Sequence, residues 1–318
     1  MPMEKIASLA DFSYPTNVPV FLCIGNFDGV HRGHRALFEL AKKTARTQNG
    51  IWGALTFSPH PEVFFRGNAA ARSIYSQATK LALFEEIGLD FAVVQAFSTE
   101  FAKIPAEDFL TTLKKSVPSL TGIFVGENFR FGAGRKGDVA LLRERAQSLD
   151  VEINALEPVL FKSERISSTR IRKELEFGEI DSANSMLGKP YFAAGTIVSG
   201  RQLGRTIGFP TLNLAWNPEL RPRFGVYAVC VKCGNRSFPG VANYGVRPTV
   251  ERGGVPEPLL ETFLLNIPEG TEIPTYGDWV FVEWRKFLRE ERRFDSLDAL
   301  REQLAEDRRQ AEAFSGNI

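Results

Sequence analysis

All three histidines of this chain, His31, His34 and His60, lie within its first 60 residues. Two of them belong to the segment GNFDGVHRGH (residues 25–34), which follows the apolar run 18–24 directly. A parallel strand that leads through such a loop into a helix presents free backbone N–H groups and the positive end of the helix dipole, which favour phosphate. Residues three apart lie on one helical turn, so both imidazoles can face the same anion. The segment predicts a phosphate-binding loop, with further contacts at Gly25, Asn26, Phe27 and Asp28.

Two other interpretations of His31 and His34 are less favoured. A zinc site would need further ligands, and His60 is the one other imidazole that the chain could supply. Two solvent-facing helix residues would also satisfy the spacing, but the glycines before them allow a phosphate to approach the backbone. The segment is neither a GxGxxG pattern nor a Walker A loop.

A second polar patch, RISSTRIR (residues 165–172), follows the last strand predicted for the same part of the chain. Its three hydroxyl groups could serve only as a helix N-cap. Its arginines add guanidinium groups, which bind phosphate through charge-assisted hydrogen bonds, so a second anion site at the same sheet edge is predicted. The residues expected to contact the nucleotide are Arg165, Ser167, Ser168, Thr169 and Arg172.

The segment GRQLGRTIGFPTLN (residues 200–213) carries candidate chemistry in the second half of the chain. Its glycines recur at intervals of four, which by itself indicates only a flexible loop. Thr211 and Asn213 alternate along an extended stretch, so their side chains share one face. A hydroxyl and an amide oxygen are hard ligands, and we expect them to bind Mg²⁺ that carries nucleotide phosphates.

A carboxylate is the expected general base of this second half, because no histidine lies beyond residue 60. Glu261 lies in the apolar run LLETFLL, where burial of a carboxylate is costly unless it serves a cleft. The alternative is a glutamate at a strand edge facing water, and Glu283 and Asp278 are the next candidates.

The first part of the chain predicts a sheet that brings the phosphate-binding loops to one edge. Apolar runs typical of strands occupy residues 18–24, 51–57, 91–97, 122–125 and 151–156. Helical periods lie at residues 80–87, 106–113 and 139–149. Strand and helix in alternation indicate parallel strands joined by right-handed crossovers. We therefore expect an α/β doubly wound parallel sheet, Rossmann-like, in residues 1–187.

The pattern becomes strand-rich after residue 187 and predicts a separate domain over residues 188–318. Strand signals lie at residues 224–231, 259–265 and 279–287, with turns expected at Gly234-Asn235, Pro239-Gly240 and Gly253-Gly254. Short strands at this spacing indicate a small antiparallel β-barrel. A final helix is expected to begin at an Asp295 or Ser296 cap and to carry Leu297, Leu300 and Leu304 on one face.

Composition restricts the kind of protein. The 318 residues include 39 Lys and Arg against 38 Asp and Glu, and a net charge of +1 provides no overall field for nucleic acid. No apolar run is long enough for a membrane span or a signal sequence, so we expect a cytoplasmic protein with no membrane partner. Cys230 and Cys233 imitate a metal motif, but their half of the chain supplies no other histidine or cysteine. A weak homo-oligomer is compatible with the sequence.

The two motifs of the first part resemble the HxGH nucleotidyltransferases, which combine GxFDxxHxGH with ISSTxxR. The match is complete at the motif positions of residues 25–34 and 166–172. The segments FSPHPE (57–62) and VGENFRFG (125–132) resemble the flavin-adenylating branch, although Asn128 stands where many relatives carry Asp. The resemblance implies catalytic roles for His31, His34 and Arg172. Flavin contacts are expected at His60, Phe65, Asn128 and Phe129.

The second part is similar to the riboflavin kinases, whose GRTxGFPTxN signature matches residues 204–213 with Leu212 in place of the usual Ala. This similarity implies that Glu261 is the catalytic glutamate and that Arg289 contacts flavin. It also implies ATP contacts at Gly200, Gly204, Arg205, Gly208, Thr211 and Asn213. The chain is identified as a member of the bifunctional riboflavin kinase/FAD synthetases. Such an enzyme phosphorylates riboflavin with ATP to FMN, then adenylylates FMN to FAD and releases pyrophosphate, with Mg²⁺ as cofactor. Riboflavin, FMN and ATP are thus the expected partners.

Two alternative functions remain from the sequence. One is a nucleotidyltransferase with another substrate, whose barrel only positions that substrate. The other is a flavin-binding regulator without turnover, which the presence of both catalytic motif sets disfavours.

Overall fold

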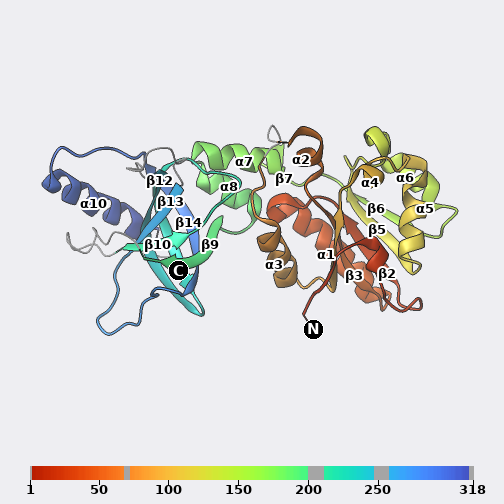
Figure 1. Cartoon of the computed structure of the whole chain (residues 1–318), viewed down its shortest axis with the longest axis horizontal. Coiled ribbons are helices and arrows are strands. Elements are labelled where there is room, and N and C mark those ends of the chain that lie inside the picture. Colours follow the sequence, from red (N-terminus) through yellow and green to blue (C-terminus); the bar gives the residue numbers. More distant parts are fainter. Residues whose placement is uncertain (1, 68–71, 200–210, 247–257, 315–318) are drawn as a thin grey trace. The chain divides into compact units, whose positions relative to one another are not determined.

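The chain folds into two compact units, Met1–Ser168 and Thr169–Ile318 (Figure 1). The computed structural model describes residues 2–67, 72–199, 211–246 and 258–314. Both predicted architectures, the parallel sheet and the antiparallel barrel, are confirmed.

A six-stranded sheet forms the centre of the first unit, in the order β1-β4-β3-β2-β5-β6. All its neighbouring pairs are parallel. The strands are β1 (Glu4–Ile6), β2 (Val20–Ile24), β3 (Ile51–Ser58), β4 (Phe91–Ala96), β5 (Leu120–Gly126) and β6 (Glu152–Leu156). The strand order reverses between β2 and β5, and ligands of such sheets bind beyond the carboxyl ends of strands at this point. The loop after β2 is therefore well placed for a ligand.

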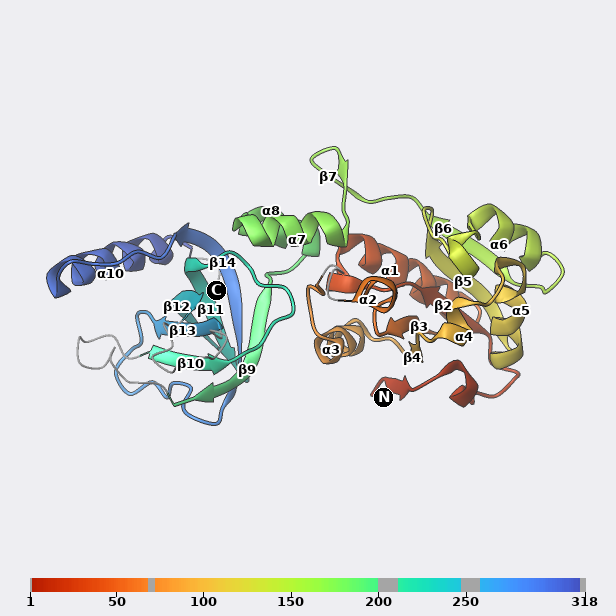
Figure 2. The same cartoon turned by 45° about the horizontal axis from the view of Figure 1, so that its top comes forward.

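Helices cover both faces of this sheet (Figures 1 and 2). On one face, Phe38 of α1 (Arg32–Thr47) contacts Trp52 of β3 and Phe84 of α3 (Gln77–Ile87). On the other face, α5 (Ala106–Ser116) and α6 (Val139–Ala146) share a core with β2. All five residues of β2 are buried, which explains why this parallel strand reads as a continuous apolar run.

The remaining elements of the first unit are short. They are η1 (Leu9–Asp11), η2 (Asp28–Val30), α2 (Pro61–Arg66), α4 (Thr99–Ala102), η4 (Ala133–Arg135) and the hairpin of β7 (Leu160–Phe161) and β8 (Glu164–Arg165). The 3-10 turn η2 lies between β2 and α1, within the predicted phosphate-binding loop.

A closed barrel of six antiparallel strands forms the second unit, in the order β10-β13-β12-β11-β14-β9. The strands are β9 (Phe192–Val198), β10 (Thr211–Ala215), β11 (Gly225–Cys233), β12 (Arg236–Val246), β13 (Pro258–Leu264) and β14 (Trp279–Arg289). Fully buried aromatic rings fill the interior, with Tyr227 and Trp284 at 4.3 Å between ring centroids. The helix α10 (Leu297–Glu312) packs Ala311 against Val226 and Val241 on the outer face.

The cap of α10 is confirmed at Ser296, whose side chain accepts a hydrogen bond from the Ala299 N–H at 3.1 Å. The turn at Gly234-Asn235 is also confirmed, because β11 ends and β12 begins on either side of it. The turn expected at Pro239-Gly240 is wrong, because β12 runs through both residues. Pro239 pairs with Cys230 in β11, and on the other side it contributes only its carbonyl, to the Leu265 N–H at 2.7 Å. Its missing N–H therefore costs no ladder bond there.

The Gly253-Gly254 pair lies outside the described residues, so that predicted turn stays a prediction.

Two helices, α7 (Ser168–Phe177) and α8 (Ile180–Leu187), are held against the barrel. The side chain of Asn184 donates to the Trp284 carbonyl at 2.8 Å and accepts from the Tyr191 N–H at 2.7 Å. The division into compact units therefore precedes these helices, whereas the sequence pattern changes between residues 187 and 188. That residues 188–318 fold alone remains a prediction.

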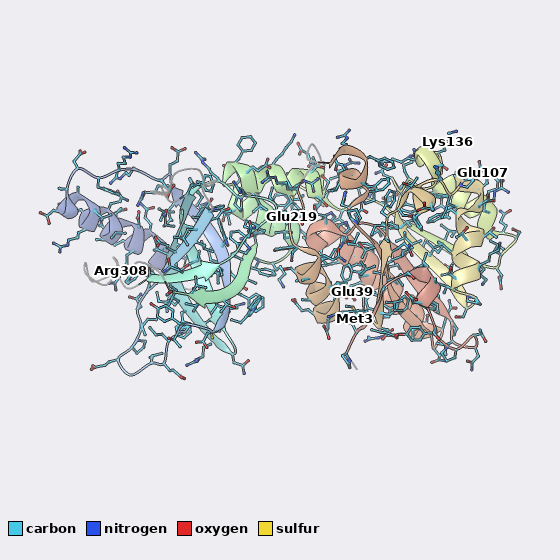
Figure 3. All side chains as sticks on the ribbon, viewed as in Figure 1. Met3, Glu39, Glu107, Lys136, Glu219 and Arg308 are labelled. Carbon is cyan, nitrogen blue, oxygen red and sulfur yellow. The ribbon has the colours of Figure 1, made fainter. Side chains whose placement is uncertain are left out.

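Charged side chains cover the outer surfaces of the helices. Glu39 on α1, Glu107 on α5 and Arg308 on α10 are exposed (Figure 3). Among the described residues, no helix is long and apolar enough to cross a membrane.

Candidate functional site

The loop after β2 has an unusual backbone. Phe27 and Val30 have φ angles of 51° and 44°, in the left-handed region that side chains disfavour, and Gly29 has 79°. Such conformations persist only where the surroundings enforce them, and they are frequent at functional sites. The turn ends at His31, which is the N-cap of α1.

The two motif histidines stack on each other at this helix N-terminus, with ring centroids 3.5 Å apart and planes 16° apart. The Nδ1 atom of His31 accepts from the backbone N–H of His34 at 3.4 Å, so the neutral ring carries its proton on Nε2 and can donate from there. Within the described residues, the buried Nδ1 atom of His34 has no hydrogen-bond partner. The two rings and the helix N-terminus form a site suited to an anion.

Burial keeps both imidazoles neutral. Desolvation lowers the pKa of His31 from 6.5 to about 4, although a hydrogen bond with its own backbone raises it slightly. Desolvation also lowers the pKa of His34 well below its ordinary value, and the charges of His31 and Lys80 lower it further. At neutral pH these residues therefore act as neutral hydrogen-bonding groups.

The structure brings one residue of the second polar patch, Ser168, to the first motif. The hydroxyl of Ser168 donates to the Asp28 carbonyl at 2.9 Å, across 140 residues of sequence. The side chain of Asp28 is buried and accepts from the Ile74 N–H at 2.8 Å, so its role includes fixing the segment before α3. Ser168 thus joins the two predicted motifs directly.

The other residues of the second patch that were predicted for adenylyl transfer are exposed or half-buried. Arg165 is exposed on β8, and Ser167 is half-buried. Thr169 and Arg172 begin the second unit, where an Arg172 guanidinium nitrogen donates to the Thr169 hydroxyl at 3.3 Å. Their contact with a nucleotide remains a prediction.

Two candidate functional residues, Lys80 and Thr56, were missed by the sequence analysis. Lys80 of α3 is buried, and its ammonium group donates to the Asn26 carbonyl at 3.0 Å and to the Thr56 hydroxyl at 2.9 Å. Thr56 donates in turn to the same Asn26 carbonyl at 3.2 Å. A lysine among the apolar residues of a helix was the available signal, because such residues are rarely buried without a specific partner.

The flavin residues predicted for the first unit lie on two segments, one after β3 and one after β5. His60 caps α2 by accepting from the Glu62 N–H at 3.1 Å. Phe65 is 66% exposed and belongs to an aromatic group with Phe64 and Phe97, whose ring centroids are 5.2 to 5.8 Å apart. Exposed rings of this kind can stack on a planar ligand.

The second of these segments follows β5. Asn128 is exposed, and Phe129 stacks on Phe131 at 5.6 Å between centroids. Phe129 also packs against the core, so its ring serves the fold as well.

A polar row crosses the outer face of the barrel. In the strand register, Asn213 of β10 is opposite Glu261 of β13, which is opposite Asn243 of β12. The row continues through Val226 of β11 to Arg289 of β14. Residues directly opposite in a sheet have Cβ atoms roughly 5 Å apart and point to the same face. The predicted metal ligand, base and flavin contact thus share one row.

Alternation places Thr211 on the same face as Asn213, as predicted, while Leu212 is opposite the buried Thr262. Glu261 is half-buried in a strand paired on both sides, so it is not at a strand edge.

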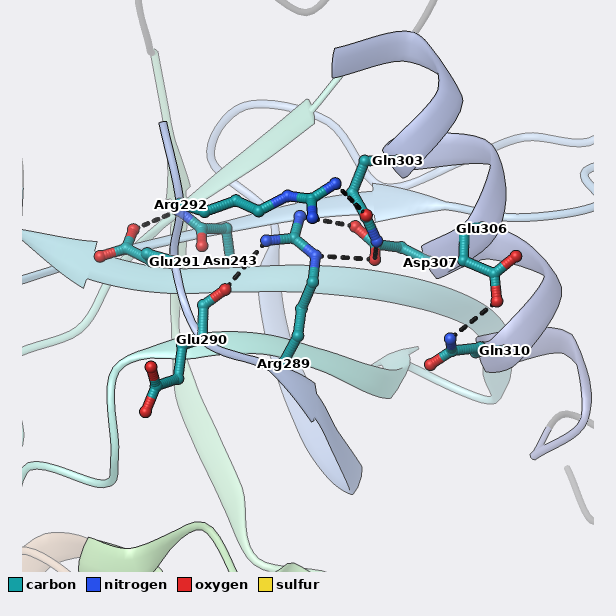
Figure 4. Close-up of polar contacts among 9 residues, drawn as sticks. All are labelled: Asn243, Arg289, Glu290, Glu291, Arg292, Gln303, Glu306, Asp307 and Gln310. Atoms are coloured by element: carbon teal, nitrogen blue, oxygen red, sulfur yellow. Dashed lines mark hydrogen bonds and ion pairs between the residues drawn. The ribbon is translucent and has the colours of Figure 1, made fainter. Parts of the chain in front are cut away.

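The end of β14 is tied to α10 by a polar network (Figure 4). Arg289 forms two hydrogen bonds of 2.8 Å with Asp307, which is only 1% exposed. Gln303 donates to the same carboxylate at 2.7 Å. The Asn243 amide donates to Glu291 at 3.0 Å, so the middle of the row is also held from this side.

Four predicted nucleotide contacts lie outside the described residues: Gly200, Gly204, Arg205 and Gly208. Cys230 and Cys233 are three residues apart on β11 and therefore point to opposite faces. No group of three or more potential metal-binding His, Cys, Asp or Glu side chains occurs in the part of the chain that the structure describes.

These features define a class of two-part nucleotide-handling proteins, with an anion-binding parallel sheet followed by a polar-faced barrel. The family model of FAD synthetase matches residues 14–170, and that of riboflavin kinase matches residues 187–315. The bifunctional riboflavin kinase/FMN adenylyltransferase of Escherichia coli K12 is 37% identical over 315 residues, 99% of this chain and 98% of that protein. That of Bacillus subtilis 168 is 30% identical and covers 93% of each chain. The chain therefore belongs to the family of bifunctional riboflavin kinase/FMN adenylyltransferases.

A solved structure also resembles the whole chain. It is described as a macrolide-efflux protein from Streptococcus pneumoniae and matches with a TM-score of 0.87 at 28% identity, over 99% of this chain and 100% of that one.

Proposed function

We propose that this chain makes FAD from riboflavin in two ATP-dependent steps at two separate sites. The barrel phosphorylates riboflavin to FMN, and the sheet unit adenylylates FMN to FAD. The observation that carries the proposal is that each unit has its own assembled set of polar residues: the histidine pair with Ser168 and Asp28, and the row through Glu261. Membership of the bifunctional family supports the same pair of reactions.

In adenylyl transfer, a phosphate oxygen of FMN attacks the α-phosphorus of ATP, and the bond to pyrophosphate breaks. No covalent step falls to the protein, so it acts by positioning and by stabilising the charge that develops on the α-phosphate. The Nε2 proton of His31 is available for this purpose, because Nδ1 accepts from the backbone. His34 and the N-terminus of α1 supply further donors at the same point. We assign Arg172 to the same phosphates on the motif alone.

In riboflavin phosphorylation, the 5′-hydroxyl attacks the γ-phosphorus of ATP and loses its proton, while ADP leaves. A general base within hydrogen-bond reach accepts that proton. We assign this role to Glu261, whose position in the row between Asn213 and Asn243 supports it. Arg289, at the end of the row, is assigned to the flavin.

ATP-dependent reactions of both kinds need a divalent metal, and we propose Mg²⁺. Thr211 and Asn213 offer two oxygen ligands on one face, and Asn213 is 4% exposed, so the residues fit a hard cation that keeps its nucleotide phosphates. Bound there, the metal would neutralise phosphate charge. A cytoplasmic location and the absence of a nucleic-acid partner stay predictions from the sequence.

The test is an assay of riboflavin with ATP and Mg²⁺, resolved for FMN and FAD, on the intact chain and on two variants. His34→Ala should lower FAD synthesis about a hundredfold or more and leave riboflavin phosphorylation nearly unchanged. Glu261→Gln should do the reverse, because it keeps the side-chain shape and removes the base. A folded variant that loses both activities together would contradict two separate sites.

The flavin assignment in the first unit has its own test. Phe65→Ala or Asn128→Ala should raise the KM for FMN more than the KM for ATP. Equal effects on both substrates would argue against a flavin contact.

A further inference from the structure

The helix α3 contacts each of three successive residues of the phosphate-binding loop. Lys80 donates to the Asn26 carbonyl, and Phe84 packs edge-on against the Phe27 ring at 5.8 Å between centroids. Just before the helix, the Ile74 N–H donates to the Asp28 side chain at 2.8 Å. No motif of the family resemblance includes residues 74–84.

These contacts explain how the loop keeps its strained backbone. Phe27 has a φ of 51°, and residues in such conformations cost of order 1–3 kcal/mol unless their neighbours hold them. The carbonyl before Phe27 is fixed by Lys80 and Thr56, and the ring of Phe27 is fixed between Phe84 and Phe38. The same ring lies edge-on to His34 at 5.2 Å between centroids. A change at Lys80 therefore reaches the histidine pair through two residues, Asn26 and Phe27.

Lys80 also brings charge into this site. It is 8% exposed, and removing an ammonium group from water costs several kcal/mol. Its ammonium group donates to two neutral acceptors, the Asn26 carbonyl and the Thr56 hydroxyl. A fixed positive charge beside a triphosphate stabilises the anion more strongly in a desolvated site than in water.

Besides burial, two ionisable residues lower the pKa of His34. They are His31, the N-cap of its own helix, and Lys80 on α3, and both disfavour a proton on His34. The charge of Lys80 thus helps to keep the second imidazole neutral.

We propose that Lys80 is a positioning residue for adenylyl transfer, which holds the Asn26–Asp28 turn under the histidine pair and supplies positive charge beside His34. This inference rests on the proposed FMN adenylyltransferase activity. A lysine with a purely structural role would only connect α3 to its neighbours, and Lys42 is a lysine of this kind. Lys42 on α1 is part-buried and donates to the Ile87 carbonyl at the other end of α3, at 3.4 Å.

The experiment compares Lys80→Met with Lys42→Met in the full chain. Lys80→Met should lower the kcat of FAD synthesis about tenfold to a hundredfold, because it displaces the donors to the α-phosphate, whereas removal of such a donor costs about a hundredfold or more. The KM for FMN should stay within about twofold of its original value, because only the chemical step loses stabilisation. Riboflavin phosphorylation should be unchanged in both variants, and Lys42→Met should keep its FAD synthesis.

A spectroscopic reading separates positioning from general loss of structure. The chain has three histidines, so ring ¹³C-labelled protein gives few NMR signals, and His31→Ala and His60→Ala assign them. Lys80→Met should raise the pKa of His34, whereas Lys42→Met should not. Lys80→Arg keeps the charge and should leave the His34 pKa low while kcat falls several-fold, about as expected for misplaced donors. If Lys80→Met does not fold, Lys80→Arg still tests the positioning role.

The outcomes distinguish the two proposals. If the unmodified chain makes no FAD from FMN, the proposed function fails and the NMR titration still reports on Lys80. If the chain makes FAD but folded Lys80→Met matches it in kcat, or leaves the His34 titration unchanged, the role of Lys80 is overturned.

Discussion

Replacing Asp307 by asparagine should destabilise the second unit and impair riboflavin phosphorylation, while FAD synthesis from supplied FMN persists. Asp307 is 1% exposed and accepts two hydrogen bonds of 2.8 Å from Arg289 and one of 2.7 Å from Gln303. Asparagine keeps the shape and one acceptor oxygen but removes the charge. The Arg289 guanidinium is then left without its carboxylate.

The magnitude follows from the burial of the pair. Breaking a buried ion pair by removing one partner costs about 3–5 kcal/mol. The Arg289 side chain is 19% exposed, so water screens part of the loss, and we expect about 2–4 kcal/mol. Arg289 is in the same strand row as Glu261, so its displacement should also raise the KM for riboflavin.

Urea denaturation followed by tryptophan fluorescence measures this change. Trp216, Trp279 and Trp284 lie in the second unit and Trp52 in the first, so the signal reports mainly on the barrel. Asp298→Asn on the same helix is the matched control, because Asp298 is 86% exposed and its contact with Arg301 is 3.5 Å long. That variant should stay within about 0.5 kcal/mol of the original protein. The reasoning would be refuted if Asp307→Asn unfolded at the same urea concentration as Asp298→Asn.

Three further predictions concern the two units. Burial lowers the pKa of His31 from 6.5 to about 4, so the unfolded state binds more protons in that window and stability falls as pH drops. His31 should account for about 2 kcal/mol of the decrease in the free energy of unfolding between pH 7 and pH 5, to which the lowered pKa of His34 adds, and His31→Asn should show a smaller decrease. Equal pH dependence in denaturation curves of the two proteins would contradict this. The fragment 188–318 should phosphorylate riboflavin by itself. The longer fragment 169–318 should have a higher melting temperature, because α8 adds the Asn184 hydrogen bonds and four buried side chains, Ile180, Ala183, Met186 and Leu187. Equal melting temperatures of the two fragments would show that α7 and α8 do not stabilise the barrel. Chelation of divalent metal should abolish both activities, with recovery on addition of Mg²⁺ and an unchanged melting curve, whereas a drop in melting temperature would indicate a structural metal.

The sequence predicted five of the six strands of the parallel sheet, and it missed β1 (Glu4–Ile6), which has three residues, two of them exposed. The run 51–57 matches β3 (Ile51–Ser58), and 91–97 matches β4 (Phe91–Ala96), since buried parallel strands read as continuous apolar runs. The barrel was harder to delimit. Its strand β12 contains Pro239 and Gly240, which usually indicate a turn, and only the pairing with its neighbours shows why the strand tolerates them.

The candidate site was predictable where function requires particular residue types close together in sequence. The histidine pair and the Thr211 and Asn213 pair are of this kind. Lys80 and Asp307 are not, because each acts on a residue that is distant in sequence. Lys80 contacts Asn26 across 54 residues, and Asp307 contacts Arg289 from a helix whose pattern indicated only an apolar face.

The hydrogen bond from Ser168 to the Asp28 carbonyl has a consequence for the order in which the enzyme assembles. A chain that emerges from the ribosome releases the loop after β2 early, and β6 completes the sheet at Leu156. Ser168 is the last residue of the first unit, so the loop after β2 lacks this hydrogen bond until that whole unit has been synthesised. Chains truncated between residues 157 and 167 should therefore contain every strand of the sheet but cannot form the hydrogen bond that joins the two motifs.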